Sequence, residues 1–295
     1  MKVLIIGGNR FLGVELTARL LARGDDVTLL NRGTLIDPFG TRVKRLRADR
    51  GTDEFDAALA GTHWDIVFDF ALFDGAQTER LIRVIDADHV VVISTGQVYL
   101  VRTPRPVIAR EADFEGPILA ASPTPEEEPE FRYGIEKRDV ETRLAASAVP
   151  YTIFRLPMVH GGRDQKQRFG RLLWKLVDRQ PIRLRAPEAP VRQVFSGAVV
   201  EALLTSSSRK ATRSAWNLAW NEDLTVRDLV DAAARGLGTT AQLAHDETAT
   251  TDDCFLNSKW MSALDATAAR RELGFTHPPL DAWLAQLTHA WISRP

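Results

Sequence analysis

The sequence predicts an α/β fold, in which helices cover both faces of a doubly wound parallel sheet and a smaller, discontinuous lobe follows. The first observation is a set of short apolar runs that alternate with helical patterns: Val3–Ile6, Val27–Leu30, Asp65–Phe68, Val90–Ile93 and Tyr151–Phe154. Near-continuous apolar runs are typical of strands buried on both faces of a parallel sheet. The second observation is the repeated strand–helix–strand order, which requires right-handed crossovers.

The elements follow in order along the chain. Between the first two runs, apolar residues recur at helical spacing: Phe11, Leu12, Leu16, Leu20 and Leu21. Gly24 stands where the C-cap of that helix belongs. After Arg155 the strand–helix rhythm loosens, and six of the seven tryptophans lie beyond residue 170. We therefore expect residues 1–157 to form the sheet domain and residues 158–295 to form a smaller lobe, partly interleaved with it.

One segment departs from this rhythm. Six of the fifteen prolines fall between Pro104 and Pro129, next to the acidic run Glu126–Glu128. Proline fixes φ and removes a hydrogen-bond donor, so the segment is expected to be a loop. Two interpretations stay open, a flank of the active site and a solvated connector.

Composition excludes several classes of protein. The 295 residues are 44% hydrophobic and 26% charged, which excludes wholesale disorder. Thirty-eight basic against thirty-nine acidic residues give a net charge of −1, which argues against a dedicated nucleic-acid binder. The single cysteine, Cys254, excludes an intrachain disulfide and a multi-cysteine metal cluster. The first apolar run is too short for a signal peptide or membrane span, so we expect a cytoplasmic protein without a membrane partner.

A glycine-rich turn follows the first strand and opens the first helix: Gly7-Gly8-Asn9-Arg10-Phe11-Leu12-Gly13. The first two glycines permit a tight turn and close approach to a pyrophosphate. The N-terminus of the helix supplies unpaired N–H groups and positive dipole for the phosphates. Gly13 lets the helix pack closely on the sheet. The turn predicts a dinucleotide-binding domain of the Rossmann type over residues 1–157.

The residues around this turn favour NADP over NAD. Glycine is usual where Arg10 stands, and an acid that binds the ribose 2′-hydroxyl is usual where Asn31-Arg32-Gly33 ends the second strand. Two arginines that converge on one corner suit a 2′-phosphate, because they form charge-assisted hydrogen bonds with it. Asp49, after the expected third strand, is a candidate contact on the adenine side. These residues, with the glycine turn, make up the predicted cofactor site.

A second group of residues predicts catalysis. Tyr133 and Lys137 are four residues apart and share one helix face. A tyrosine with a pKa near 10 is a poor acid–base group at pH 7, and a neighbouring ammonium together with a nicotinamide cation lowers that pKa. Thr95 follows a strand at the carboxyl end of the sheet, where ligands bind in such folds. We therefore predict that Thr95, Tyr133 and Lys137 meet one carbonyl oxygen.

The motifs together resemble the extended short-chain dehydrogenase/reductase family, also called the NAD-dependent epimerase/dehydratase family. The segments that carry the resemblance are Gly7–Gly13, Ser94–Tyr99, Tyr133 with Lys137, Arg155–Gly161, Trp216–Ala219, Leu224–Leu229 and Ala268–Phe275. The glycine turn and Asn31-Arg32-Gly33 are most similar to a subgroup that includes chloroplast stem-loop-binding proteins and bacterial reductase-like enzymes.

The resemblance implies that Thr95, Tyr133 and Lys137 are the catalytic residues, and that Lys137 also holds the hydroxyls of the nicotinamide ribose. One departure is Ser196, where the family often has aspartate. Three arginines of the lobe, Arg183, Arg185 and Arg192, are candidates to hold a diphosphate or are solvated cations of the lobe surface.

The first function predicted is an NADP-dependent oxidoreductase that reduces a carbonyl, or oxidises an alcohol, of a small molecule. A nucleotide-sugar epimerase or dehydratase is the alternative within the family. A nucleotide-sensing or RNA-binding protein is the alternative from another class, supported only by the run Arg42, Lys44, Arg45, Arg47 and Arg50. The six histidines show no ligand spacing, so no metal is expected, although His160 is a candidate to line the substrate pocket. A monomer or homodimer is expected.

Overall fold

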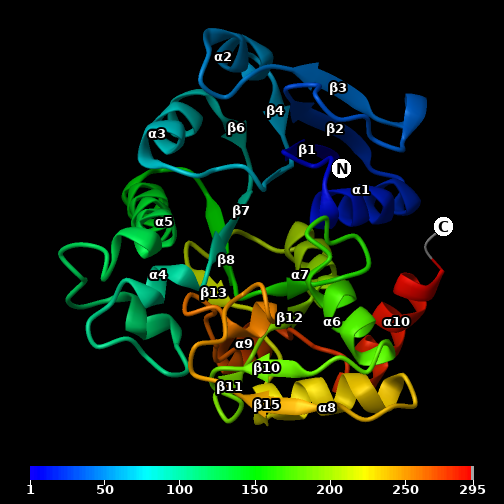
Figure 1. Cartoon of the computed structure of the whole chain (residues 1–295). Coiled ribbons are helices and arrows are strands. Elements are labelled where there is room, and N and C mark those ends of the chain that lie inside the picture. Colours follow the sequence, from blue (N-terminus) through cyan, green and yellow to red (C-terminus); the bar gives the residue numbers. More distant parts are fainter. Residues whose placement is uncertain (294–295) are drawn as a thin grey trace.

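The computed structural model describes residues 1–293 and is built on a seven-stranded, wholly parallel sheet (Figure 1). Its order is β13-β8-β7-β5-β1-β2-β3. The strands are β1 (Lys2–Ile6), β2 (Asp26–Asn31), β3 (Lys44–Arg47), β5 (Ile66–Asp69), β7 (Val90–Thr95), β8 (Tyr151–Leu156) and β13 (Ala215–Asn217). The prediction of a doubly wound parallel α/β sheet is confirmed, and each of the five predicted apolar runs forms a strand.

Alternate residues of each strand enter two different cores. In β1, Val3 and Ile5 pack with α1, α7 and α9, whereas Leu4 and Ile6 pack with α2, α3 and α5. These helices are α1 (Phe11–Arg23), α2 (Asp53–Leu59), α3 (Gly75–Val84), α5 (Glu128–Ala146), α7 (Ser196–Ser207) and α9 (Thr267–Leu273). Burial on both faces explains why the strands lack polar alternation.

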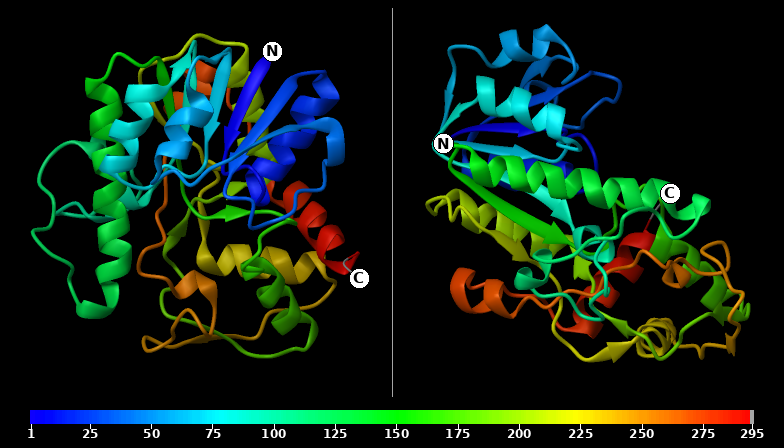
Figure 2. Two further views of the ribbon diagram at one scale, coloured as in Figure 1. Left: turned by 90° about the horizontal axis from the view of Figure 1, so that it is seen from above. Right: turned by 90° about the vertical axis from the view of Figure 1, so that its left-hand side faces the viewer.

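The remaining elements form a lobe on one side of the sheet (Figures 1 and 2). It contains α6 (Arg168–Val177), α8 (Val226–Gly236), α10 (Leu280–Ile292) and the strand pairs β10 (Ile182–Leu184) with β15 (Leu243–His245) and β11 (Pro190–Val191) with β14 (Leu224–Thr225). Its own core includes Trp220 and Trp283. β9 (Val159–His160) pairs with β12 (Val194–Phe195) where the lobe meets the sheet. Because α7, β13 and α9 return to the sheet layers, the chain passes between the two parts more than once.

The proline-rich loop is held in place at several points. The Thr103 N–H donates to the Pro117 carbonyl at 3.1 Å, and the Asn217 N–H donates to Glu111 Oε1 at 2.9 Å. The Arg105 guanidinium lies 4.5 Å from the centre of the Trp260 ring. These contacts fix the loop against β13 and the segment before α9. Across residues 1–293, no helix combines the length and the apolar character that a bilayer span requires.

Candidate active site

The structure brings Thr95, Tyr133 and Lys137 together. Thr95 ends β7, and the two other residues lie one turn apart on α5, which packs against that strand. The Thr95 hydroxyl lies near enough to the Tyr133 phenol to lower its pKa, and Lys137 Nζ lies 5.8 Å from the centre of the Tyr133 ring. The prediction that three side chains from two separate elements converge on one point agrees with this geometry.

Lys137 is only 2% exposed, and its ammonium is held by main-chain oxygens. Nζ donates to the Leu72 carbonyl at 2.6 Å and to the Ile93 carbonyl at 2.9 Å. An ammonium has three donors, so among the hydrogen bonds of residues 1–293 one N–H of Lys137 is left available. Burial lowers the pKa of Lys137 to about 8, partly offset by Asp69 and Glu141, so the group keeps its charge at pH 7.

The pKa of Tyr133 moves in the direction opposite to the one expected from the sequence. Burial, followed by the Glu130 carboxylate, raises it to about 12, and only the neighbouring Thr95 hydroxyl acts to lower it. In the protein alone the phenol therefore stays protonated at neutral pH. The physical reason is that desolvation of the phenolate outweighs an ammonium that already faces two carbonyls.

A buried polar network lies directly behind these residues. Arg155 on β8 pairs with Glu141 on α5 at 2.6 Å, and their side chains are 5% and 3% exposed. Ser94 Oγ donates to Glu141, and Arg155 donates to the Tyr99 hydroxyl at 2.7 Å. Glu141 is one turn after Lys137, so the network ties α5 to β7 and β8 at the level of Lys137.

A cavity of about 680 Å³ opens above Tyr133, between the sheet domain and α6. Its sheet-side wall includes Gln97, Glu130, Tyr133 and Met158, and the opposite wall includes Cys254, Phe255 and Trp260. Gln97 Nε2 donates to Glu130 at 2.6 Å. The cavity has the size of a small-molecule site, and of Thr95, Tyr133 and Lys137 only the Tyr133 side chain lines it.

Four cations line the same cavity, and sequence reasoning missed all of them: Lys166, Arg168, Arg171 and Lys175. The spacing of Arg168, Arg171 and Lys175 along α6 was the available signal, since residues three and four apart share a helix face, whereas Lys166 precedes the helix. Arg168 pairs with Asp164, and Lys175 Nζ donates to the Asp253 carbonyl at 2.5 Å. Glu130, Asp252 and Asp253 are the acids of the cavity wall, so positive and negative charges face one another there.

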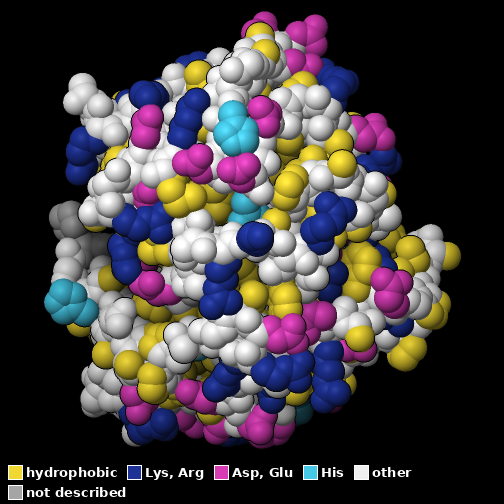
Figure 3. Space-filling view, turned by 180° about the vertical axis from the view of Figure 1, so that it is seen from behind, with side chains coloured by type: hydrophobic (Ala, Val, Ile, Leu, Met, Phe, Trp, Pro, Cys, Tyr) yellow, Lys and Arg dark blue, Asp and Glu magenta, His cyan; other side chains and the backbone are white. Residues whose placement is uncertain are grey.

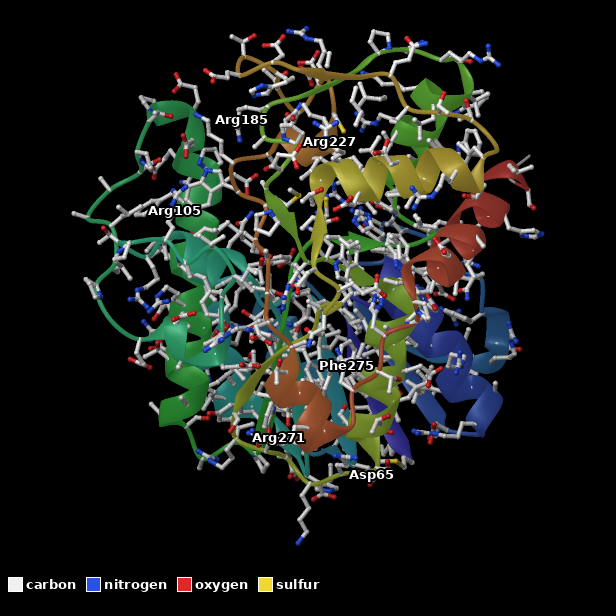
Figure 4. The ribbon with its side chains drawn as sticks, turned by 90° about the horizontal axis from the view of Figure 1, so that it is seen from below. Asp65, Arg105, Arg185, Arg227, Arg271 and Phe275 are labelled. Carbon is white, nitrogen blue, oxygen red and sulfur yellow. The ribbon has the colours of Figure 1, made fainter. Side chains whose placement is uncertain are left out.

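The arginines expected to hold a diphosphate do not line this cavity. Arg183 pairs with Asp246 and Asp253, and Arg192 pairs with Asp223, so their charges are already matched by carboxylates. Arg185 lies on the far side of the lobe from Asp65 (Figure 4) and is absent from the cavity wall. Arg183 and Arg192 were candidates to hold a diphosphate, but the fold pairs them with carboxylates. Sequence spacing does not reveal such pairing.

His160 is also absent from the cavity wall, so the expectation that it lines the pocket is wrong. It is 1% exposed, its ring stacks on Trp283 at 5.8 Å, and Nε2 is hydrogen-bonded to Gln193. Burial lowers the pKa of His160 to about 4, so the ring is neutral. Ser196 is 3% exposed and donates to Glu15 at 3.1 Å, which links α7 to α1.

The glycine turn has the geometry of a phosphate cradle. Gly7 has φ +81°, and a Cβ at Gly13 would lie 2.5 Å from Gly8 Cα. Arg10 is the N-cap of α1 with φ −133°, an extended conformation open to any residue, so arginine costs no backbone strain there. The positive φ falls on Phe11 instead, at +37°. Because Arg10 makes no side-chain cap, the first N–H groups of α1 remain available to an anion.

Substituting Gly13 with alanine tests this close packing. The added methyl group would meet the main chain of Gly8, which cannot move aside as a flexible side chain would. We expect Gly13→Ala to lower the free energy of unfolding by about 1–3 kcal/mol and to weaken dinucleotide binding. Gly236→Ala is the control, since nothing lies within 4 Å of its Cβ and the residue is helical. Urea unfolding measures the free energy of unfolding of both variants. Equal values for Gly13→Ala and Gly236→Ala would contradict the close packing of Gly13 against Gly8.

The adenosine corner of the cofactor site is formed where β2 ends. Asn9 Nδ2 donates to the Leu35 carbonyl at 3.0 Å, which fixes the loop after β2. Arg32 lies 3.7 Å from Asp49 Oδ2, and the two side chains are 69% and 50% exposed. Asn31 Nδ2 is buried with no hydrogen-bond partner within residues 1–293. An orphaned donor beside an exposed arginine suits a ligand that offers acceptor oxygens, so these residues fit the phosphate-bearing ribose of a dinucleotide.

Two surfaces away from the cavity concern the expectations about metal binding and RNA binding. His63, Asp65 and Asp88 bring ligand atoms within 4.8 Å of one another, because β4 (His63–Trp64) pairs with β6 (Asp86–Ala87), a proximity that sequence spacing missed. His63 also contacts Asp86 at 2.9 Å, so ion pairs account for the cluster. Asp65 lies at the opposite end of the molecule from Arg105, which contacts the cavity residue Trp260 (Figure 4).

The basic run that supported RNA binding is largely neutralised. Lys44 pairs with Asp26, Arg45 with Asp37 and Arg50 with Asp69. On the face seen in Figure 3, acidic and basic side chains are interspersed. That face therefore does not present a surface of one charge to the phosphate backbone of a nucleic acid.

Comparisons with known proteins agree with this architecture. The chain is 18% identical to UDP-glucose 4-epimerase from Thermotoga maritima, with a TM-score of 0.75 and 99% of each chain covered. It is 16% identical to UDP-glucuronic acid 4-epimerase from Bacillus cereus, solved with NAD, with a TM-score of 0.74, covering 99% of this chain and 96% of that one. The chain has the fold of the extended short-chain dehydrogenases/reductases.

One curated protein also matches the chain in sequence. The chain is 23% identical over 260 residues to the chloroplast stem-loop binding protein of 41 kDa b from Arabidopsis thaliana, an alignment that covers 80% of this chain and 63% of the relative. The chain thus spans less than two thirds of that protein's length. No family model matches the chain.

Proposed function

We propose that the chain is an NADP-dependent oxidoreductase that reduces a carbonyl, or oxidises an alcohol, of a small molecule. The observation that carries the proposal is the meeting of Thr95, Tyr133 and Lys137, of which Tyr133 lines a cavity of about 680 Å³. Within it, residues 1–157 are assigned to cofactor binding and residues 158–295 to substrate binding. The single cysteine fits a cytoplasmic location.

Each residue has a defined task in this reaction. When bound, the nicotinamide donates a hydride to the carbonyl carbon or accepts one from the alcohol carbon. Tyr133 donates its phenolic proton to the carbonyl oxygen in reduction and takes it back in oxidation. Thr95, which lies beside the phenol, orients the carbonyl oxygen. Lys137 places one free N–H and a positive charge beneath Tyr133, where they stabilise the phenolate and hold the cofactor ribose.

The positive charge of the residues proposed to bind the cofactor favours NADP over NAD. Asn9, Phe11 and Leu12 shape the turn between the glycines, and Arg10 and Arg32 bring positive charge to its adenosine side. A 2′-phosphate is matched by guanidinium groups, which form bidentate, charge-assisted hydrogen bonds. Asp49 remains a proposed contact on the adenine side, and its distance to Arg32 allows both to face the ligand.

Arg32→Ala is expected to weaken NADPH binding roughly tenfold and to leave NADH binding unchanged. A charged hydrogen bond contributes roughly 1.5–3 kcal/mol, and the exposure of Arg32 places the effect at the low end of that range. Fluorescence titration with both cofactors measures it. Arg19→Ala is the control, because it removes an exposed arginine of α1 that pairs with Glu201 of α7. Equal affinities of the unchanged protein for NADPH and NADH would contradict the proposal.

A nucleotide-sugar epimerase or dehydratase is the second candidate, favoured by the cations of the cavity wall. Lys166 and Arg171 have no carboxylate within ion-pair distance in residues 1–293, so they remain able to bind an anionic substrate such as a nucleoside diphosphate. The two functions differ in their use of the cofactor. A reductase consumes NADPH, so absorbance at the nicotinamide band falls as product forms, whereas an epimerase turns its substrate over with no net change.

Neutralising these cations tests the second candidate through binding of UDP. We expect Lys166→Gln combined with Arg171→Gln to weaken UDP binding roughly tenfold or more if the cavity holds a diphosphate. Arg227→Gln is the matched control, because Arg227 pairs with Glu188 and lies outside the cavity wall (Figure 4). Calorimetric titration measures the affinities. If the unchanged protein does not bind UDP, the nucleotide-sugar candidate fails and the reductase candidate stands.

A further inference from the structure

The corner where β2 and β3 end contains a cation that the cofactor site above does not use. Asn31 and Arg47 are register partners at the carboxyl ends of the two strands. Because β3 is the edge strand, no further strand covers Arg47 on its outer side. The Arg47 guanidinium donates through Nη1 to Asn31 Oδ1, and the Gly33 N–H donates to the same oxygen at 2.9 Å.

These two donors determine how the Asn31 amide is turned. The oxygen must face Arg47 and Gly33, since both neighbours offer only hydrogens. The NH₂ group therefore faces the other way, and it is the buried donor that has no partner within residues 1–293. The oxygen of the Asn31 amide thus orients the Arg47 guanidinium, and the NH₂ group of the same amide remains available as a hydrogen-bond donor.

The turn at Gly33 brings Arg47 beside Arg32. Gly33 has φ +77°, and a Cβ there would lie 3.1 Å from Arg47 Cδ and 3.3 Å from Nε. The stem of Arg47 therefore crosses the turn, which a side chain at residue 33 would obstruct. Arg32 directly precedes the turn, so the two guanidinium groups flank it.

Arg47 makes no ion pair within residues 1–293, in contrast to its neighbours. Lys44, Arg45 and Arg50 each have a carboxylate within ion-pair distance. Arg47 has a neutral amide oxygen as its partner, and no carboxylate of the described chain lies within 4 Å of its nitrogens. An exposed cation held in a fixed orientation by an uncharged group remains available to an anion.

We infer that Arg47 is a specificity-determining residue that binds the 2′-phosphate of NADP, with Asn31 as the residue that positions its guanidinium. The inference rests on the NADP preference proposed above. It adds a third arginine to Arg10 and Arg32 and assigns to β3 a role in cofactor choice.

The experiment compares Arg47→Met with Lys44→Met in titrations with NADPH, NADH and adenosine 2′,5′-bisphosphate. Both variants keep an unbranched stem and remove one positive charge from the same edge strand, but Lys44 lies at the amino end, paired with Asp26. We expect Arg47→Met to weaken NADPH and the bisphosphate at least tenfold and to leave NADH within twofold. Lys44→Met is expected to change all three less than twofold. Asn31→Asp, which gives Arg47 a carboxylate partner, is expected to lower the NADPH-to-NADH affinity ratio as well.

The outcomes separate this inference from the proposed function. If the unchanged protein prefers NADPH and Arg47→Met keeps that preference, Arg47 is not part of the site and the NADP proposal stands. Equal losses in Arg47→Met and Lys44→Met overturn the inference too, because they indicate general charge attraction. If the unchanged protein binds NADH as tightly as NADPH, the proposed NADP preference fails and the role of Arg47 fails with it. A parallel loss of NADH affinity in Arg47→Met indicates a structural role and also overturns the inference.

Discussion

Tyr133→Phe is expected to lower turnover about 10²–10⁴-fold while NADPH affinity stays within about twofold. The substitution removes only the phenolic oxygen, which is the proposed proton donor, and general acid–base groups typically contribute that range. The ring remains to fill the space beside Lys137 and the cavity wall. Steady-state kinetics with a verified substrate, together with a cofactor titration, separate the chemical step from binding.

Two further variants sharpen this result. Tyr151→Phe removes a phenol that donates to the Arg213 carbonyl at 2.8 Å, away from the cavity wall, so turnover should be unchanged. Lys137→Met should damage both turnover and cofactor binding, because the ammonium supports the phenol and is proposed to hold the ribose. It also leaves the Leu72 and Ile93 carbonyls without a donor, so its stability must be measured alongside. Full turnover by Tyr133→Phe would contradict a catalytic role for the pair formed by Tyr133 and Lys137.

Glu141→Gln is expected to lower the free energy of unfolding by about 3–5 kcal/mol. The substitution keeps the shape of the side chain but leaves the Arg155 guanidinium buried without a counter-charge, which costs several kcal/mol. Burial by itself would lower the pKa of Arg155. The nearby Glu141 carboxylate acts in the opposite direction, and the pKa of Arg155 is raised overall. Ser94 also loses a charged acceptor. Because the network anchors α5 behind Lys137, turnover should fall with stability.

The matched control lies at the surface of the same layer. Glu79 pairs with Arg143 of α5, and their side chains are 65% and 37% exposed. Exposed ion pairs contribute about 0–1 kcal/mol, so Glu79→Gln should change the free energy of unfolding by less than about 1 kcal/mol. Urea denaturation of both variants measures the difference. Similar losses in the two would contradict the assignment of a structural role to the buried network.

Strands and local motifs were predictable because their signals are local. The run Val3–Ile6 is apolar on both faces, and each face indeed enters its own core. Tyr133 and Lys137 share a face by helical spacing alone, and Thr95 ends a parallel strand whose position follows from the fold. In the structure α8 begins with a capping box, in which the side chains of Thr225 and Asp228 each bond the other residue's main-chain N–H, and this signal is also local.

Other features depend on contacts between distant segments. The cations of α6 face the cavity only because the lobe folds back over Tyr133, and the pairing of Arg183 and Arg192 with acids is equally non-local. His160 follows a strand in the sequence but is enclosed by Trp283 and other aromatic rings. The direction of the Tyr133 pKa shift depends on burial, which helical spacing does not report.

The ionisation of Tyr133 tests the central claim most directly, since it needs no knowledge of the substrate. The measurement is the difference in tyrosinate absorbance between the unchanged protein and Tyr133→Phe across pH, with and without NADP⁺. Without cofactor, burial and Glu130 hold the pKa near 12, so no signal should rise below pH 10. With NADP⁺ bound, the positive charge of the nicotinamide beside the phenol should move the transition below pH 10. A transition that stays above pH 10 in both conditions would contradict the role of Tyr133 as the acid–base group.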